Sequence, residues 1–89
     1  MKRSKSKDFF NKTKKIIPGG VNSPVRSFSA VSSTPFIVKK SKGSKITDID
    51  NNNYIDFIGS WGAMILGHSD NRILKKLNQV SMNGLTYGA

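Results

Sequence analysis

The chain has 89 residues, no cysteine and a hydrophobic fraction of 36%. This composition limits it to one small domain and excludes both a disulfide framework and a thiolate metal site. Its net charge is +10, from 15 Lys and Arg against 5 acidic residues. Because no apolar run reaches membrane-spanning length and none follows the basic N-terminus as in a secretory signal, we expect a cytoplasmic protein that does not contact a membrane.

The first part of the chain predicts a tail and one helix. Residues 1–5 are polar and charged, and they predict a disordered basic tail. Residues 6–17 predict a helix, with Ser6 or Asp8 as its N-terminal cap and the Pro-Gly-Gly run at 18–20 as its end. Side chains at helical spacing predict one apolar face for it: Phe9, Phe10, Thr13, Ile16 and Ile17.

A long loop and a small sheet are predicted next. Residues 21–34 contain Ser, Val and Pro without a clear period, which predicts a structureless loop, and loops of this length are often functional. Three short strands are predicted at Phe36–Lys40, Lys45–Ile49 and Tyr54–Ile58. Turn-forming clusters of Gly, Ser, Asp and Asn separate them, and such short connections predict an antiparallel meander.

The last part of the chain predicts a Gly-rich connection and a second helix. Residues 59–68 form the connection, and a helix follows from about Asn71 to Asn83, with Ser69 or Asp70 as its cap. Four apolar residues mark the expected buried face of this helix: Ile73, Leu74, Leu77 and Val80. Helix, long loop, three-stranded meander and helix together make the predicted fold class α+β.

Residues 18–26 read Pro-Gly-Gly-Val-Asn-Ser-Pro-Val-Arg and are the most informative run in the sequence. Two prolines fix φ, and two adjacent glycines permit backbone conformations closed to other residues, so this loop can aim a side chain at a ligand. The planar guanidinium of Arg26 suits a carboxylate or a phosphate. Taken alone, however, the run favours the alternative of a surface turn with a solvated arginine.

The only tryptophan and the only histidine of the chain both lie in the Gly-rich connection. Trp61 stands between glycines, where its ring suits a pocket wall, although one tryptophan in a small domain is usually core. His68 is the only histidine, so no His cluster for zinc exists, and we predict a structural hydrogen bond for it. Residues 48–52 resemble the start of a calcium loop, but Asn53 and Gly59 stand where Gly and Glu are required. We therefore expect no metal site.

These motifs occur in an order that resembles the N-terminal part of the glutamate-1-semialdehyde 2,1-aminomutases, pyridoxal-phosphate enzymes related to the class III aminotransferases. The resemblance extends from about Phe9 to Ala89. Its specific part is the run at 18–26 together with Gly-Ser-Trp-Gly at 59–62. The more general elements are Thr34-Pro35, Asp48-Ile49-Asp50, Tyr54-Ile55-Asp56, Leu66-Gly67-His68 and the run from Gly84 to Ala89.

The chain departs from the family pattern at three places. Asn51 stands where the family usually carries glycine. Asparagine is the best non-glycine substitute at a left-handed position, so we expect this turn to survive. Asp70-Asn71 replaces a His-Pro pair and Ala63 replaces a proline. These departures bear on local turn geometry and leave the specific motifs intact.

The resemblance implies a fold-type I pyridoxal-phosphate-dependent transferase, of which residues 6–89 are the N-terminal segment, truncated before the large cofactor-binding domain. It implies a cytoplasmic, homodimeric isomerase that uses pyridoxal 5'-phosphate. The small-molecule substrate would be glutamate-1-semialdehyde and the product 5-aminolevulinate, in tetrapyrrole (porphyrin) biosynthesis. In such enzymes, the residues matching Ser23, Arg26 and Trp61 bind the substrate, and the arginine pairs with its carboxylate.

The resemblance also implies what this chain lacks. None of its twelve lysines matches the Schiff-base lysine of the family, and the cofactor-binding loops of such enzymes lie downstream. We therefore expect the 89-residue chain alone to bind no cofactor and to catalyse no reaction. No catalytic residue, cofactor-binding residue or metal ligand is predicted within it.

Three alternatives stay open. A small basic nucleic-acid-binding protein would use the seven basic residues that precede Ile16, although aromatic side chains for base stacking are not interleaved with them beyond Phe9 and Phe10. A non-catalytic interaction module that pairs with a full-length homologue is the second alternative. The third is a different class III aminotransferase, and the run at 18–26 argues against it.

Overall fold

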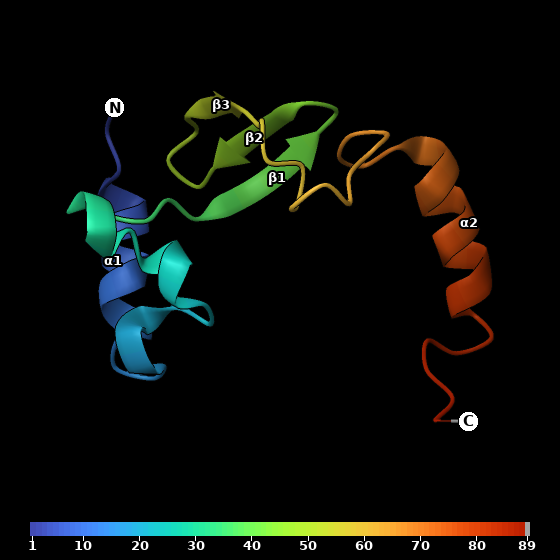
Figure 1. The fold of residues 1–89 in the computed structure, drawn as a ribbon, viewed down its shortest axis with the longest axis horizontal. Coiled ribbons are helices and arrows are strands. Elements are labelled where there is room, and N and C mark those ends of the chain that lie inside the picture. Colours follow the sequence, from blue (N-terminus) through green and yellow to red (C-terminus); the bar gives the residue numbers. More distant parts are fainter. Residues whose placement is uncertain (89) are drawn as a thin grey trace. The chain divides into compact units, whose positions relative to one another are not determined.

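The computed structural model describes residues 1–88. Ala89, the last residue of the final sequence motif, lies outside the described residues. The main elements are two helices and three strands (Figure 1): α1 (Ser4–Thr13), β1 (Val38–Lys42), β2 (Lys45–Asp48), β3 (Asn53–Ile55) and α2 (Asn71–Ser81). The strands form one sheet in the order β1-β2-β3. The predicted α+β fold, with a meander between two helices, is therefore confirmed.

The chain divides into two compact units. The first unit contains Met1–Lys40 and Ile46–Tyr54. The second unit contains Ser41–Lys45 and the chain from Ile55 onward. The first unit therefore holds α1 and the predicted functional loop, whereas the second holds the Gly-rich connection and α2.

Helix α1 begins earlier than the sequence predicts, because its cap comes from elsewhere in the chain. The side-chain oxygens of Asp50 accept hydrogen bonds from the amides of Lys5 (2.8 Å) and Ser6 (2.9 Å) and from the Ser6 hydroxyl (2.7 Å). Neither Ser6 nor Asp8 caps the helix, and Ser4 and Lys5 belong to it although the sequence assigns both to the tail. A carboxylate at a helix N-terminus also complements the helix dipole.

The electrostatics of Asp50 agree with this role. Burial opposes its ionisation, but the hydrogen bonds from Ser6 and Lys5 outweigh that effect and lower the pKa of the carboxyl. Asp50 is therefore charged at neutral pH, in the state that accepts the amide protons of the helix start.

Helix α1 also ends four residues before its predicted end. The Thr13 hydroxyl donates to the carbonyls of Phe10 and Gly20, both at 2.9 Å, and so ties the end of the helix to the turn that follows. This turn is a short 3-10 helix at Pro18–Gly20. Ile16 is 81% exposed, so it does not continue the buried face. The apolar residues at helical spacing continue past Thr13, so the predicted helix includes residues that belong to the turn after α1.

The core of the first unit is small and largely aromatic. Phe10 is the buried large apolar residue among those described, at 8% exposed. The ring of Phe36 stacks on Tyr54 at a centroid distance of 4.7 Å and meets the edge of Phe28 at 5.8 Å. The Arg3 guanidinium lies 5.8 and 5.9 Å from the centroids of Phe36 and Tyr54, a cation–π arrangement.

Asp48 is a fully buried carboxylate at the end of β2. It accepts hydrogen bonds from the Tyr54 hydroxyl (2.7 Å) and from the amide and side-chain nitrogen of Asn52 (2.8 and 2.9 Å). Burial opposes ionisation, but these hydrogen bonds outweigh it and lower the pKa of Asp48. Burial and the bond to Asp48 raise the pKa of Tyr54. Asp48 and Asp50, the carboxylates of the calcium-loop-like segment, thus both accept hydrogen bonds from groups of this chain.

The strands lie close to their predicted places. Strand β1 begins two residues later than expected and β3 is shorter, although the amide of Ile49 still donates to the Ile37 carbonyl at 2.9 Å. Asn51 has a φ of 67°, so asparagine does occupy the left-handed position in the turn between β2 and β3. The predicted survival of this turn is confirmed.

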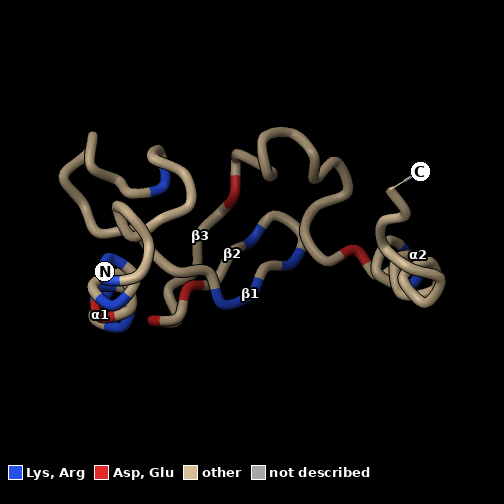
Figure 2. Tube along the Cα trace, turned by 90° about the horizontal axis from the view of Figure 1, so that it is seen from below, with Lys and Arg blue, Asp and Glu red and all other residues tan. Residues whose placement is uncertain are grey.

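Positive charge gathers along α1, where Figure 2 shows several Lys and Arg positions. Of the two aromatic residues on this helix, Phe9 is half-exposed and Phe10 is buried. The side chain of Phe10 is covered by the Lys14 ammonium at 4.4 Å from its ring centroid. Helix α1 therefore lacks the row of exposed aromatic rings on which bases stack.

Helix α2 carries an uncovered apolar stripe. Its four predicted buried residues are between 42% and 55% exposed: Ile73, Leu74, Leu77 and Val80. The first three of them and the apolar segment 63–66 together line a groove of about 520 Å³. The prediction that these residues are buried is wrong for the described residues, because nothing else in the second unit covers the stripe. Within residues 1–88, no helix is long and apolar enough to cross a membrane.

The start of α2 gives a test that depends on pH. Asp70 accepts a hydrogen bond from the Arg72 amide (2.9 Å) and pairs with its guanidinium (2.8 Å), which confirms Asp70 as the cap. The Arg72 side chain lowers the pKa of Asp70 to about 2. We expect the ¹³C signal of the Asp70 carboxyl to titrate near pH 2, and nearer the ordinary value of about 4 in Arg72→Gln.

The sign of the effect on stability follows from that lowered pKa. The charged cap stabilises the helix start above about pH 4, and this contribution is lost as the pH falls through about 2. Equal titration midpoints in the wild type and Arg72→Gln would contradict the assigned cause.

Candidate functional site

The loop that carries Ser23 and Arg26 is built from short turns. Residues 24–27 and 29–31 form two 3-10 helices, so the prediction of a structureless loop over 21–34 is wrong. Pro24 begins the first of them, which suits its fixed φ. The Ser27 hydroxyl donates to the Pro24 carbonyl at 2.7 Å and so closes this turn locally. The loop is therefore ordered by its own residues.

The start of this loop is anchored on α1 at Gly20. This residue is buried and has a φ of 74°. A Cβ at this position would lie 2.7 Å from the Phe10 ring and 2.9 Å from the Lys14 side chain. Only glycine allows the backbone to approach the helix this closely with a left-handed φ.

Ser23 and Arg26 lie in one turn. The Arg26 amide donates to the Ser23 carbonyl at 3.0 Å, and the Arg26 guanidinium donates to the Asn22 side chain at 3.3 Å. Ser23 is half-buried and Arg26 is exposed. The ion pairs among residues 1–88 are His68–Asp56 and Arg72–Asp70, so no carboxylate there occupies the Arg26 fork. Arg26 thus keeps most of its donors for a ligand.

Trp61 belongs to the second unit and lies in a strained turn. The four consecutive residues 59–62 all have positive φ, with values of 55°, 52°, 63° and 90°. Two of them, Ser60 and Trp61, are not glycine, and such strain is concentrated at functional sites. The Trp61 ring is 78% exposed, so it is not a core residue of this chain.

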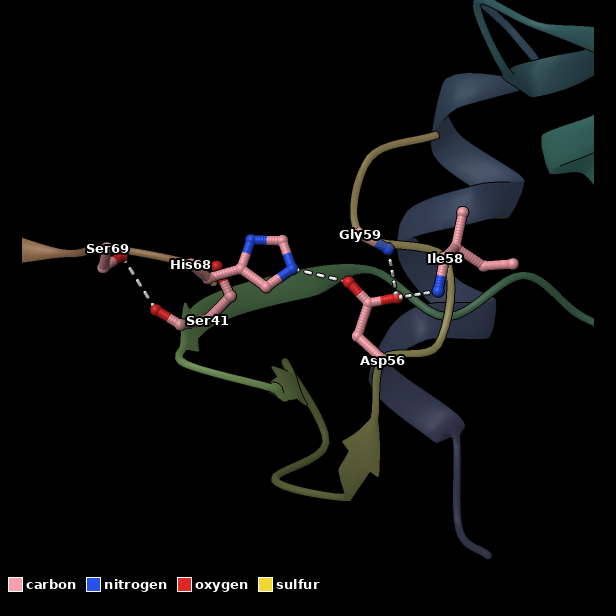
Figure 3. Close-up of polar contacts among 6 residues, drawn as sticks. All are labelled: Ser41, Asp56, Ile58, Gly59, His68 and Ser69. Carbon is pink, nitrogen blue, oxygen red and sulfur yellow. Dashed lines mark hydrogen bonds and ion pairs between the residues drawn. The ribbon is translucent and has the colours of Figure 1, made fainter. Parts of the chain in front are cut away.

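A hydrogen bond that the sequence did not single out, between Asp56 and His68, closes the chain segment bearing Trp61. Figure 3 shows the His68 ring facing the Asp56 carboxylate, with 2.6 Å between Nε2 and Oδ2. The other oxygen of Asp56 accepts from the amides of Ile58 (2.8 Å) and Gly59 (3.1 Å). The His68 bond and these amides lower the pKa of Asp56. Its carboxylate is therefore ionised, and Nε2 carries the donated proton.

The described residues include no enclosed lysine. All twelve lysines are exposed, whereas a Schiff-base lysine requires an enclosed pocket that lowers its pKa. No group of three metal-ligating side chains occurs in the part of the chain that the structure describes. The chemistry available here is the recognition of an anionic group by Arg26 and an aromatic surface at Trp61.

The sequence matches one enzyme family over most of its length. The family model described as aminotransferase class-III matches residues 28–87. The curated glutamate-1-semialdehyde 2,1-aminomutase of Acetivibrio thermocellus is 55% identical over 89 residues, which is 100% of this chain and 21% of that protein. The protein of the same name from Thermosipho melanesiensis is 56% identical over 79 residues, which is 89% of this chain and 19% of that protein. The chain spans about a fifth of the length of these relatives.

Solved structures agree with the match. A structure described as a transaminase with PLP bound has a TM-score of 0.85 and 27% identity, covering 100% of this chain and 20% of that one. A glutamate-1-semialdehyde-aminomutase from Pseudomonas aeruginosa PAO1 has a TM-score of 0.81 at 20% identity, covering 96% of this chain and 18% of that one, and so supports the fold. The predicted relation to the pyridoxal-phosphate transferase fold is confirmed. The chain belongs to the class-III aminotransferase family.

Proposed function

We propose that this chain is the N-terminal part of a glutamate-1-semialdehyde 2,1-aminomutase, which converts glutamate-1-semialdehyde to 5-aminolevulinate in porphyrin biosynthesis. The observation that carries the proposal is the 55% identity, over the whole chain, to a curated protein of that name. The run at 18–26 and the Gly-Ser-Trp-Gly turn at 59–62, which are the specific part of the motif pattern, support the same choice within the family.

Ser23, Arg26 and Trp61 bind the substrate in this proposal. Arg26 pairs its guanidinium with the substrate carboxylate, which its exposed position and its single weak internal hydrogen bond support. Ser23 supplies a hydroxyl from the same turn. Trp61 supplies an apolar wall, as its exposed ring on a Gly-flanked turn supports. These contacts hold and orient the substrate and help to exclude water from it.

The remaining machinery lies outside these 89 residues in this proposal. Pyridoxal 5'-phosphate, when bound to the complete enzyme, supplies the electron sink for amino-group transfer. Its Schiff-base lysine would be in the downstream part of the protein, because none of the twelve lysines here matches the one in the family pattern. The complete enzyme would be a cytoplasmic homodimer, and the 89-residue chain alone would bind no cofactor and be inactive.

The test uses the protein at the length at which its source cells make it, here called the full-length protein. Its intact mass should be several-fold that of the 89-residue chain. With pyridoxal phosphate, it should form 5-aminolevulinate from glutamate-1-semialdehyde, whereas the 89-residue chain in the same assay should form none. A full-length mass equal to that of the 89-residue chain would overturn the proposal and favour a partner-interaction module, which should then co-purify with a larger homologue.

A further inference from the structure

The segment that carries Trp61 is closed at its base by side chains on either side of it. Asp56 precedes the segment 59–67 and His68 follows it, and their side chains meet at 2.6 Å (Figure 3). Both groups are nearly buried, with 7% of the Asp56 side chain and 14% of the His68 side chain exposed. A charged hydrogen bond in such a partly buried place is stronger and more directional than one in water. We call residues 59–67 the Trp61 loop.

Backbone contacts hold the two ends of the Trp61 loop against the turn between β1 and β2. The amide and carbonyl of His68 pair with the carbonyl and amide of Gly43, both at 2.8 Å. The Asp56 amide donates to the Ser44 carbonyl at 2.8 Å. Gly67 makes this approach possible, because a Cβ there would lie 3.0 Å from the Gly43 backbone. Backbone bonds that do not involve the imidazole therefore hold the two ends of the loop.

The imidazole is linked to the turn that precedes Trp61 through the Asp56 carboxylate. Oδ2 of Asp56 faces His68, and this leaves Oδ1 aimed at the amides of Ile58 and Gly59, where the left-handed run at 59–62 begins. Inside the loop, the Gly59 carbonyl accepts from the amides of Gly62 (3.1 Å) and Met64 (3.0 Å). A run of non-glycine residues at positive φ persists only where surrounding contacts over-determine it. Asp56, oriented by His68, supplies such contacts.

We propose that Asp56 and His68 are positioning residues whose hydrogen bond sets the orientation of the Trp61 ring. The consequence for substrate rests on the proposed function, in which Trp61 forms a wall of the substrate pocket. Loss of the pair should then weaken the binding of substrate and transition state alike, so KM rises while kcat changes little. A pair that only stabilised the fold would reduce the amount of active protein and leave KM unchanged.

Three variants of the full-length protein separate these roles. His68→Leu removes the imidazole donor but keeps the backbone bonds to Gly43. His68→Gln returns an N–H at nearly the position of Nε2. Tyr54→Phe removes a matched hydrogen bond to a carboxylate, that of Asp48 at 2.7 Å in the first unit, and is the control. We expect KM to rise about tenfold in His68→Leu, to recover in His68→Gln and to stay within about twofold in Tyr54→Phe.

A spectroscopic signal reports the ring directly. In protein labelled with 5-fluorotryptophan, the ¹⁹F resonance of Trp61 is assigned by its loss in Trp61→Phe. We expect this resonance to shift or broaden in His68→Leu, to return in His68→Gln and to be unchanged in Tyr54→Phe. If His68→Leu does not yield folded protein, Asp56→Asn replaces it, because its side chain keeps an acceptor for the two amides and loses the charge.

The results test the positioning role of Asp56 and His68 separately from the proposed function. An unchanged Trp61 resonance in His68→Leu or Asp56→Asn would overturn the positioning role, whatever the activity. A shifted resonance with a normal KM would keep the role in ring orientation and overturn its link to substrate. A wild-type protein that forms no 5-aminolevulinate would refute the proposed function, while the ¹⁹F measurement would still test the role of the Asp56–His68 hydrogen bond.

Discussion

Arg26→Ala is expected to lower kcat/KM of the full-length protein for glutamate-1-semialdehyde by about 10²–10³-fold. Removing one partner of a charge-assisted, bidentate hydrogen-bond pair raises the free energy of the bound state by about 3–4 kcal/mol, and each 1.36 kcal/mol is a factor of ten. The fold should be unaffected, because Arg26 is exposed and makes one side-chain hydrogen bond, of 3.3 Å, to Asn22. Steady-state kinetics with a thermal unfolding control measures both effects.

Lys39→Ala is the matched control for that prediction. Lys39 is also an exposed cation in the first unit, and its ammonium makes one long hydrogen bond, of 3.4 Å, to an asparagine side chain. Its removal changes the net charge by the same amount, and we expect kcat/KM to stay within about twofold. Arg26→Lys should give an intermediate loss, because it keeps the charge but not the planar fork. Equal losses in Arg26→Ala and Lys39→Ala would remove Arg26 from the substrate site.

Gly20→Ala is expected to destabilise the first unit by about 2–5 kcal/mol. Part of this is the strain of a Cβ at a φ of 74°, and the rest is the collision of that Cβ with the Phe10 ring at 2.7 Å. Phe10 is the buried aromatic ring of α1, so it has little room to move. Hydrogen exchange of the α1 amides, measured in the full-length protein, should show the loss as faster exchange.

Gly19→Ala separates the two causes. Gly19 has a similar φ of 73°, but a Cβ there would meet nothing within 4 Å. Only the backbone strain should therefore appear, about 1–2 kcal/mol. If both variants exchange equally fast, the contact between Gly20 and α1 contributes nothing. Gly20→Ala should also raise KM, since it displaces the start of the loop that carries Arg26.

The parts of the fold that the sequence predicts well depend on local patterns. The start of α2 follows from Asp70, a capping residue directly before an amphipathic run. The meander follows from short turn clusters, and Asn51 does adopt the left-handed turn conformation. Helix α1 was placed less well, because its cap, Asp50, is 44 residues from Ser6 in the sequence. No local pattern carries such information.

In the candidate site, too, local motifs indicate some residues, and a pairing between distant residues is missed. Ser23, Arg26 and Trp61 were found through motifs, and their roles remain predictions. The pairing of Asp56 with His68 was not found, because the sequence offers five aspartates and no rule that assigns one of them to a histidine twelve residues later. A useful signal was nevertheless present. The lone histidine, His68, directly follows the Gly-rich loop, and Asp56 lies three residues before that loop.

The distant cap of α1 has a consequence for the order in which the chain folds. A helix of ten residues is marginal in water by itself, and the one carboxylate that satisfies its first amides lies in the turn between β2 and β3. That turn holds Asp50 in place only when the two strands that flank it have paired. Helix α1 should therefore become persistent only after β2 and β3 have paired. Helix α1 precedes both strands in the sequence, yet it would be the last element of the first unit to fold.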